Sequence, residues 1–227
     1  MKKFLFLFVA IVFCSPAFAA SVTGKATFTG TPPNPAKIDM NADPVCAGSG
    51  STVTSEDVVV NSNGTLKNVF VYVKEGLEGQ TFTAPTEKVV MNQQGCHYSP
   101  HVFGAQVNQP VEIVNSDATL HNVHGMPKAS KEFNLGMPIQ GMKVTRKFDK
   151  PEVMVKFKCD VHPWMHAYVG VVDHPFFAVT GEDGSFEIKN LPPGQYTLEA
   201  WHEKFGTQTQ QITVDDSGKV ADFTFAG

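Results

Sequence analysis

The sequence is poor in three features, each of which would point to a familiar class of protein. After its first twenty residues it has no apolar run near the ~20 residues that a membrane-spanning helix requires, so no membrane span is predicted. It has no amphipathic stretch of helical period, which argues against a helical fold. It also lacks an excess of positive charge, with 18 basic against 22 acidic side chains and a formal net charge of −4. Nothing therefore indicates a nucleic-acid partner.

The first twenty residues, MKKFLFLFVAIVFCSPAFAA, are typical of a cleaved secretory signal peptide. Two lysines precede a short apolar core that ends in small residues, so cleavage is expected after Ala19 or Ala20. The alternative is a lipoprotein anchor at Cys14, but bulky Phe13 stands where such signals need a small residue. We therefore expect a periplasmic or otherwise exported protein, soluble after cleavage. Its formal charge is then −6, because 16 basic side chains remain against 22 acidic ones.

What is abundant fits short strands joined by turns. The chain has 18 Phe, 19 Gly and 15 Pro, a composition that favours an all-β fold. Roughly 207 mature residues are enough for one large β domain or two small ones. Cysteine is scarce, and only Cys46, Cys96 and Cys159 remain after cleavage. In an oxidising compartment two of them are expected to pair, and the third needs a reason, such as a metal bond, to stay free.

Alternating segments and turn residues divide the rest of the chain into three parts. Residues 21–84 include an expected edge strand in VTGKATFTG and a second strand in LKNVFVYV. Residues 85–173 contain pairs of alternating strands around a histidine-bearing loop, ATLHNVHGMPKAS. Residues 174–227 are a run of strands divided by turn dipeptides such as Asp183-Gly184, with no cysteine or methionine, which indicates a scaffold.

The last of these parts has a recognisable pattern, in which a D-G turn is followed by F-x-I and then by L-P-P-G-x-Y. This pattern resembles the later strands of the carboxypeptidase regulatory, transthyretin-like β-sandwich. The opening strands of that fold are missing from the tail, but VTGKATFTG and LKNVFVYV near the N-terminus are similar to them. The resemblance implies one discontinuous β-sandwich with residues 85–173 inserted in it. Two separate small domains are the alternative.

Soft metal ligands gather in one short segment, FKCDVHPWMHAYVGVV, which spans residues 157–172. Cys159, His162 and Met165 follow one another at intervals of three, and thiolate, imidazole and thioether are ligands that copper favours. A further imidazole lies upstream in NSDATLHNVHG, where His121 is expected to follow a strand and begin a loop. A blue copper site needs two imidazoles, one thiolate and a distant thioether. The sequence offers that set.

The two segments resemble the cupredoxins, the plastocyanin/azurin family, and in particular the compact Cys-x-x-His-x-x-Met loop of amicyanin-like members. The resemblance implies a Greek-key β-sandwich over residues 85–173. It also implies one type 1 copper ion with four ligands: His121, Cys159, His162 and Met165. The asparagine after the first ligand, Asn122, would brace the two ligand loops by hydrogen bonds.

The chain departs from the amicyanin pattern at two positions. Leu120 stands before the first histidine, where that pattern has proline. His166 follows the expected axial methionine directly and is a rival for the axial position. The second departure leaves the spectral class of the copper site open.

The remaining cysteines and histidines are given other roles. Cys46 and Cys96 are expected to form a disulfide that ties an N-terminal loop to the copper domain. A second metal site that uses Cys96, His97 and His101 is the alternative. The other three are expected to be loop, core or packing residues rather than ligands: His124, His174 and His202.

The predicted function is single-electron transfer by a mononuclear type 1 copper protein, not an enzyme. Its partners would be redox proteins such as a cytochrome or a dehydrogenase, and His162, flanked by Pro163 and Trp164, would reach the surface as the electron port. A multicopper oxidase would need His-x-His pairs, and a binuclear centre would need two cysteines in one loop; the sequence has neither. Two alternatives stay open. One is copper storage or delivery, and the other is a mononuclear copper enzyme or sensor with an open axial position.

Overall fold

The computed structural model describes residues 20–48 and 53–227. The predicted signal peptide, including Cys14, lies outside these residues apart from Ala20. The regular structure of the described chain is almost entirely β-strand, which confirms the predicted all-β class, and the single helix among the described residues is the short α1 (Pro44–Gly48). No described helix has the length and apolar character needed to cross a bilayer.

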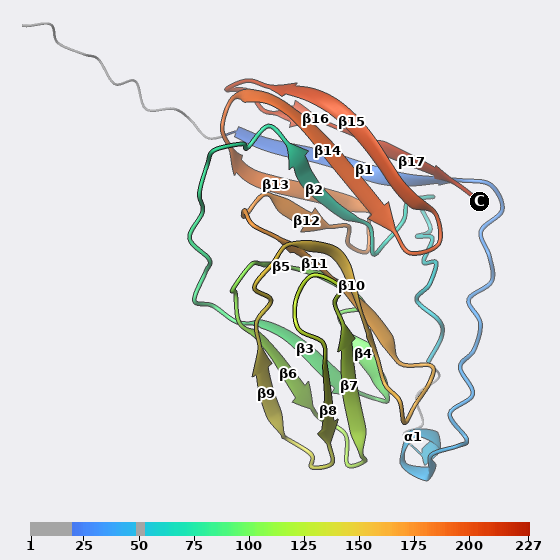
Figure 1. The fold of residues 1–227 in the computed structure, drawn as a ribbon. Coiled ribbons are helices and arrows are strands. Elements are labelled where there is room, and N and C mark those ends of the chain that lie inside the picture. The colour runs from blue at the N-terminus through green and yellow to red at the C-terminus, as the bar shows by residue number, and fades with distance from the viewer. Residues whose placement is uncertain (1–19, 49–52) are drawn as a thin grey trace, which may run out of the picture.

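The strands form two β-sandwiches, one above the other in Figure 1. The first, which we call the outer sandwich, joins both ends of the described chain. One of its sheets has the order β13-β1-β16, with β17 also paired to β1, and the other has the order β12-β2-β14-β15. Its strands are β1 (Ala20–Thr29), β2 (Phe70–Glu75), β12 (Phe177–Val179), β13 (Ser185–Leu191), β14 (Gly194–His202), β15 (Gly206–Val214), β16 (Lys219–Val220) and β17 (Phe223–Ala226).

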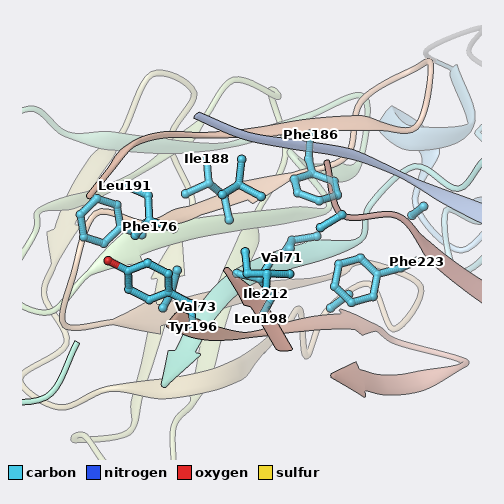
Figure 2. Packing of buried hydrophobic residues seen from close by; sticks show 14 of the residues in the cluster. Val71, Val73, Phe176, Phe186, Ile188, Leu191, Tyr196, Leu198, Ile212 and Phe223 are labelled. Atoms are coloured by element: carbon cyan, nitrogen blue, oxygen red, sulfur yellow. The ribbon is translucent and has the colours of Figure 1, made fainter. Parts of the chain in front are cut away.

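The first strand of the outer sandwich is not an edge strand, so that expectation was wrong. β1 pairs with β13 on one side and with β16 and β17 on the other. The reason is that the C-terminal strands return to the N-terminus and cover the edge that local sequence leaves open. Between the two sheets lies a buried core, in which Val71 and Val73 of β2 and Leu198 of β14 belong to one sheet and Ile188 of β13 belongs to the other (Figure 2). β2 is buried on both faces, because Val71 and Val73 face this core and Phe70 and Tyr72 belong to a separate buried cluster with Val102 and Val172 of the second set of sheets.

The second sandwich, which we call the inserted sandwich, lies between β2 and β12 in the chain. Its sheets have the orders β5-β11-β10-β7-β8 and β4-β3-β6-β9. Its strands are β3 (Val89–Gln94), β4 (His97–Ser99), β5 (Val102–Gln106), β6 (Val111–Asn115), β7 (His121–Met126), β8 (Phe133–Met137), β9 (Lys143–Arg146), β10 (Glu152–Lys158) and β11 (His166–Val172). The histidine-bearing segment was expected to be a loop, but it is strand β7, paired with β8 and β10. Its sequence, HNVHGM, shows no clear alternation of apolar and polar residues from which a strand could be predicted.

Aromatic rings join the two sandwiches. Phe70 on β2 and Phe177 on β12 have ring centroids 5.7 Å apart and pack against β5 and β11. Gly104 and Gly170, which face each other across β5 and β11, leave room for these rings. A Cβ atom on Gly170 would lie 2.4 Å from the Phe70 ring, and one on Gly104 would lie 2.2 Å from the Phe177 ring. The two sandwiches therefore meet through a close contact that only glycine permits at these two positions.

The long connection between β1 and β2 runs the length of the inserted sandwich and carries α1 to its far end (Figure 1). There a disulfide joins Cys46 of α1 to Cys96, which lies between β3 and β4. The expected pairing is present. It excludes the alternative metal site at Cys96, because a disulfide sulfur is not a thiolate ligand.

Candidate metal centre

The sequence-predicted ligands come from one strand, β7, and from the turn between two strands of the same sheet, β10 and β11. His121 is the first residue of β7, and the segment between β10 and β11 contains Cys159, His162 and Met165. Two backbone hydrogen bonds fold this segment tightly: Cys159 N–H donates to the Met165 carbonyl at 3.0 Å, and Met165 N–H donates to the His162 carbonyl at 2.9 Å. Pairing of β10 with both β7 and β11 then brings the turn beside His121.

Three donor atoms converge there. Nδ1 of His121 lies 2.9 Å from Nδ1 of His162, and Cys159 Sγ lies 3.8 Å from the same His162 atom. His121 is 0% exposed, and Cys159 and His162 are each 2% exposed. The ligand atoms of the three residues all lie within 4.8 Å of one another. We call these three residues the thiolate cluster. Met165 is 1% exposed and packs in the same core.

Each imidazole of the thiolate cluster is held from behind by a carboxylate. His121 Nε2 lies 2.9 Å from Asp117 Oδ2, and His162 Nε2 lies 3.0 Å from Asp43 Oδ2. An ionised carboxylate only accepts, so each Nε2 carries the proton and donates it. Each Nδ1 then presents a lone pair, and the two lone pairs face each other. A cation bound between them would remove this repulsion, and carboxylate bracing of this kind is usual behind metal-ligating histidines.

The two bracing carboxylates are themselves fixed by backbone amides. Asp43 caps α1, where Oδ1 accepts hydrogen bonds from the N–H groups of Val45 and Cys46, and Oδ2 accepts one from Thr119. Burial raises the pKa of Asp43, but the hydrogen bonds from Thr119, His162 and the two amides outweigh it and lower the pKa to about 2. Asp117 accepts hydrogen bonds from the N–H groups of Gly95 and Cys96.

Sequence reasoning missed both carboxylates. Asp117 could have been suspected from the sequence, because it lies only four residues before His121, in the turn that follows β6. Asp43 had only the weak signal of an N-cap residue before a short helix. Its partner His162 is 119 residues away in sequence, so no local pattern links them.

The expectation that His162 reaches the surface is wrong. Its ring is 2% exposed because Asp43 and the disulfide-linked Cys46 lie over its Nε2, with the Cys46 sulfur at 3.8 Å. The neighbouring Pro163 is exposed and Trp164 is half-buried, with its ring centroid 5.1 Å from that of His162. Trp164 Nε1 donates to the Cys96 carbonyl, so the same disulfide segment also holds this ring. We call the segment 43–46 with its disulfide the cap.

Electrostatics favour a neutral first imidazole. Burial lowers the pKa of His121 below its ordinary value; the hydrogen bond to Asp117 raises it in part, and the neighbouring His162 lowers it further. The backbone N–H of His162 donates to Cys159 Sγ at 3.3 Å and so fixes the sulfur beside the two rings. Neutral imidazoles and a thiolate are the forms that bind metal ions.

The expected bracing residue Asn122 does link the two strands that carry the cluster. Its side-chain oxygen accepts a hydrogen bond from the backbone N–H of Asp160, the residue after Cys159. Its backbone carbonyl accepts a hydrogen bond from the hydroxyl of buried Tyr98. Asn122 therefore ties β7 to the turn that holds the thiolate.

The other histidines lie elsewhere. The imidazole of His166 faces Asp57 and Glu203 and belongs to a different group of side chains from Cys159. His124 pairs with Glu132 and Asp160 at the surface side of β7. His174 and His202 are buried, and each ring stacks on a phenylalanine, Phe176 and Phe205.

Comparison with protein families bears on the outer sandwich. Residues 162–226 match the model of the carboxypeptidase regulatory-like domain. The C-terminal segment of the chain is thus similar to that domain. The match begins at His162, so it also takes in β11 of the inserted sandwich, whereas β12–β17 lie in the outer one. Among curated proteins no relative matches the chain.

Three of the solved structures similar to the chain are described as a copper enzyme or as cupredoxins. A Cu-containing nitrite reductase from Thermus scotoductus SA-01 is 22% identical over 42% of this chain and 24% of its own, with a TM-score of 0.37. A purple cupredoxin from Nitrosopumilus maritimus is 22% identical over 37% of this chain and 98% of its own, with a TM-score of 0.32. A point mutant of amicyanin with Cu(I) is 22% identical over 37% of this chain and 81% of its own, with a TM-score of 0.33. This chain thus spans about a quarter of the nitrite reductase chain. The resemblances are partial, so the candidate centre rests on its own geometry.

Proposed function

We propose that the protein is an exported mononuclear copper protein that carries single electrons between redox partners. His121, Cys159 and His162 would be the strong ligands and Met165 the weak axial one. The observation that carries the proposal is the pair of carboxylate-braced imidazoles whose Nδ1 atoms face each other 2.9 Å apart beside a buried free cysteine.

The donor set fits copper. Two imidazoles, a thiolate and a thioether form a soft set, and a His₂Cys site with a weak methionine is typical of blue copper electron carriers. When bound there, copper would supply one-electron redox chemistry. The protein's part is to hold the donors in place: Asp43 and Asp117 fix the rings, Asn122 fixes the turn, and burial excludes water.

A carrier suits this centre better than an enzyme. All four candidate ligands are at most 2% exposed, so a small-molecule substrate has no direct approach to a coordination position. Carriers need only a short distance between the centre and a docking surface. Exposed apolar side chains stand close to the cluster in sequence: Val45 on the cap, Leu120 before His121 and Val161 before His162 are each 45% exposed. Such residues suit weak, short-lived docking.

The test is the absorption and EPR spectrum of the mature protein with one equivalent of Cu(II), alongside Cys159→Ser, His121→Gln and His124→Gln. We expect intense thiolate-to-copper charge transfer in the parent, which bleaches with reductant and returns with oxidant. Cys159→Ser should abolish it, and His121→Gln should weaken or shift it. His124→Gln is the matched control, because His124 lies on the same strand but outside the cluster.

A weakly absorbing Cu(II) form that Cys159→Ser leaves unchanged would overturn the proposal. A strong band that cannot be cycled would contradict electron transfer while keeping the metal ligands. In that case copper storage or delivery would be the better account.

A further inference from the structure

A second group of metal-binding side chains lies where the two sandwiches meet. His101 stands between β4 and β5, His166 begins β11, and Glu203 lies in the turn between β14 and β15. His101 Nε2 is 2.7 Å from Glu203 Oε2, and His166 Nε2 is 3.6 Å from the same oxygen. The ring centroids of the two histidines are 5.0 Å apart. One carboxylate oxygen and two ring nitrogens thus lie within 4.8 Å of one another.

A second carboxylate, Asp57, faces the same point from the long connection. Its Oδ1 lies 3.2 Å from His166 Nε2, yet it is buried and accepts no hydrogen bond from the described residues. The other oxygens of both carboxylates turn to Lys204, whose Nζ lies 2.8 Å from Asp57 Oδ2 and 3.6 Å from Glu203 Oε1. Lys204 therefore orients both carboxylates so that their free oxygens face the imidazoles.

This group, which we call the interface cluster, is His101, His166, Glu203 and Asp57. The side chains of His101 and Glu203 are 4% and 5% exposed, whereas those of His166 and Asp57 are 24% and 30% exposed. A cavity of about 210 Å³ borders Asp57, His101 and His166. The cluster is therefore buried on one side and open on the other, which gives an ion a way in and leaves room for water ligands.

We propose that the interface cluster is a second metal site, which binds a divalent ion of the zinc type through two imidazole nitrogens and carboxylate oxygen. Two histidines and one carboxylate are the protein ligands of known zinc sites that keep open positions, and borderline divalent ions accept such mixed nitrogen and oxygen donors. Asp57 Oδ1 is buried and accepts no hydrogen bond from the described residues, and its one close polar neighbour is His166 Nε2 at 3.2 Å, so a cation bound beside these two atoms would pair with both.

A metal ion at this site would tie the two sandwiches together. His101 and His166 belong to the inserted sandwich, Glu203 to the outer one, and Asp57 to the long connection between β1 and β2 of the outer sandwich. Binding to the folded arrangement alone raises stability in proportion to the logarithm of the free metal concentration. The site is distinct from the thiolate cluster in its ligands, although His166 follows Met165 in the chain.

The test is the zinc stoichiometry of the mature protein, measured by titration calorimetry and by metal analysis after gel filtration. We expect two zinc ions per parent chain, one at each cluster. Glu203→Gln should weaken one of them by at least about 100-fold, because loss even of an outer partner costs ~10–100-fold in affinity. Glu199→Gln is the matched control: Glu199 is a buried carboxylate of the same strand pair, bonded to Tyr72 and Lys74.

A measurement on the parent needs no variant. The ring nitrogen resonances of His101 and His166 should shift on addition of zinc, together with a rise in the unfolding temperature. Unchanged resonances, or equal stoichiometry in Glu203→Gln and the parent, would overturn the second site and leave a hydrogen-bonded ion cluster. Cys159→Ser separates the two proposals, because it should reduce only the binding at the thiolate cluster.

Discussion

Both clusters contain imidazoles and carboxylates, but the carboxylates lie in different places relative to the rings. In the thiolate cluster the carboxylates of Asp43 and Asp117 stand behind the imidazoles, and a sulfur stands in front. In the interface cluster the carboxylates of Glu203 and Asp57 stand in front, beside the ring nitrogens. In the two proposals, the position of the carboxylate, rather than its presence, distinguishes the soft site proposed for copper from the harder site proposed for zinc-type ions.

The clusters also differ in how they are built. Strands β7 and β10 of one sheet hold the thiolate cluster, and the cap closes it from outside. The interface cluster depends on contact between both sandwiches. Variants that disturb the cap or the sandwich contact should therefore affect one cluster and spare the other.

The largest effect is expected from Cys46→Ser with Cys96→Ser. The disulfide spans 50 residues, for which the chain-entropy estimate is about 4 kcal/mol of unfolding free energy. Release of the cap should also free Asp43 and expose His162, and so weaken copper binding. Urea unfolding, followed by copper and zinc titration, measures both. A loss of zinc affinity at the interface cluster as large as the loss of copper affinity would contradict the separation of the clusters.

The next effect is expected at the contact between sandwiches. Gly170→Ala places a Cβ 2.4 Å from the Phe70 ring, and such overpacking typically costs ~1–3 kcal/mol. The variant should lower the unfolding temperature and weaken zinc binding at the interface cluster, with the copper band unchanged. Gly136→Ala is the control, because no atom lies within 4 Å of its added Cβ. A loss of the copper band in Gly170→Ala would contradict the independence of the two clusters.

A smaller effect is expected from Asp117→Asn. Asparagine also offers a donor to His121 Nε2, so the tautomer that exposes a lone pair at Nδ1 is no longer fixed. Loss of such a partner typically lowers metal affinity ~10–100-fold. Competition with a copper chelator measures it. Glu132→Gln, at the exposed pair with His124, should leave the affinity unchanged. A similar drop in both variants would mean that general charge, and not the brace, is responsible.

Local patterns predicted part of this structure and could not predict the rest. The all-β class followed from turn residues and alternating strands, and the spacing of Cys159, His162 and Met165 singled out the turn that does lie beside His121. That these residues bind copper stays a prediction, as do the domain boundaries. The cap and the interface cluster were missed because they join segments far apart in sequence: 119 residues separate Asp43 from His162, and 102 separate His101 from Glu203.

A buried histidine outside both clusters, His174, hydrogen-bonds to backbone groups instead of carboxylates and is expected to give the smallest effect. His174 is 6% exposed; its Nε2 donates to the Val73 carbonyl at 2.8 Å, and its Nδ1 accepts from Phe176 N–H. Burial lowers its pKa below 6.5; the Val73 carbonyl and nearby Asp173 offset this only in part. The folded state therefore has a neutral ring at a pH where the unfolded state already binds a proton.

The sign of the pH effect follows. Below about pH 6.5 the unfolded chain binds the extra proton, so stability falls as the pH falls, until the folded-state pKa is passed. One such group contributes at most roughly 1 kcal/mol at pH 6. His174→Gln should flatten this fall in urea unfolding at pH 7.5, 6.5 and 5.5, measured against the parent. An unchanged slope would assign the acid sensitivity to other buried histidines, such as His121, whose pKa burial also lowers. Saturation with copper should then remove it, because a bound metal ion excludes the proton.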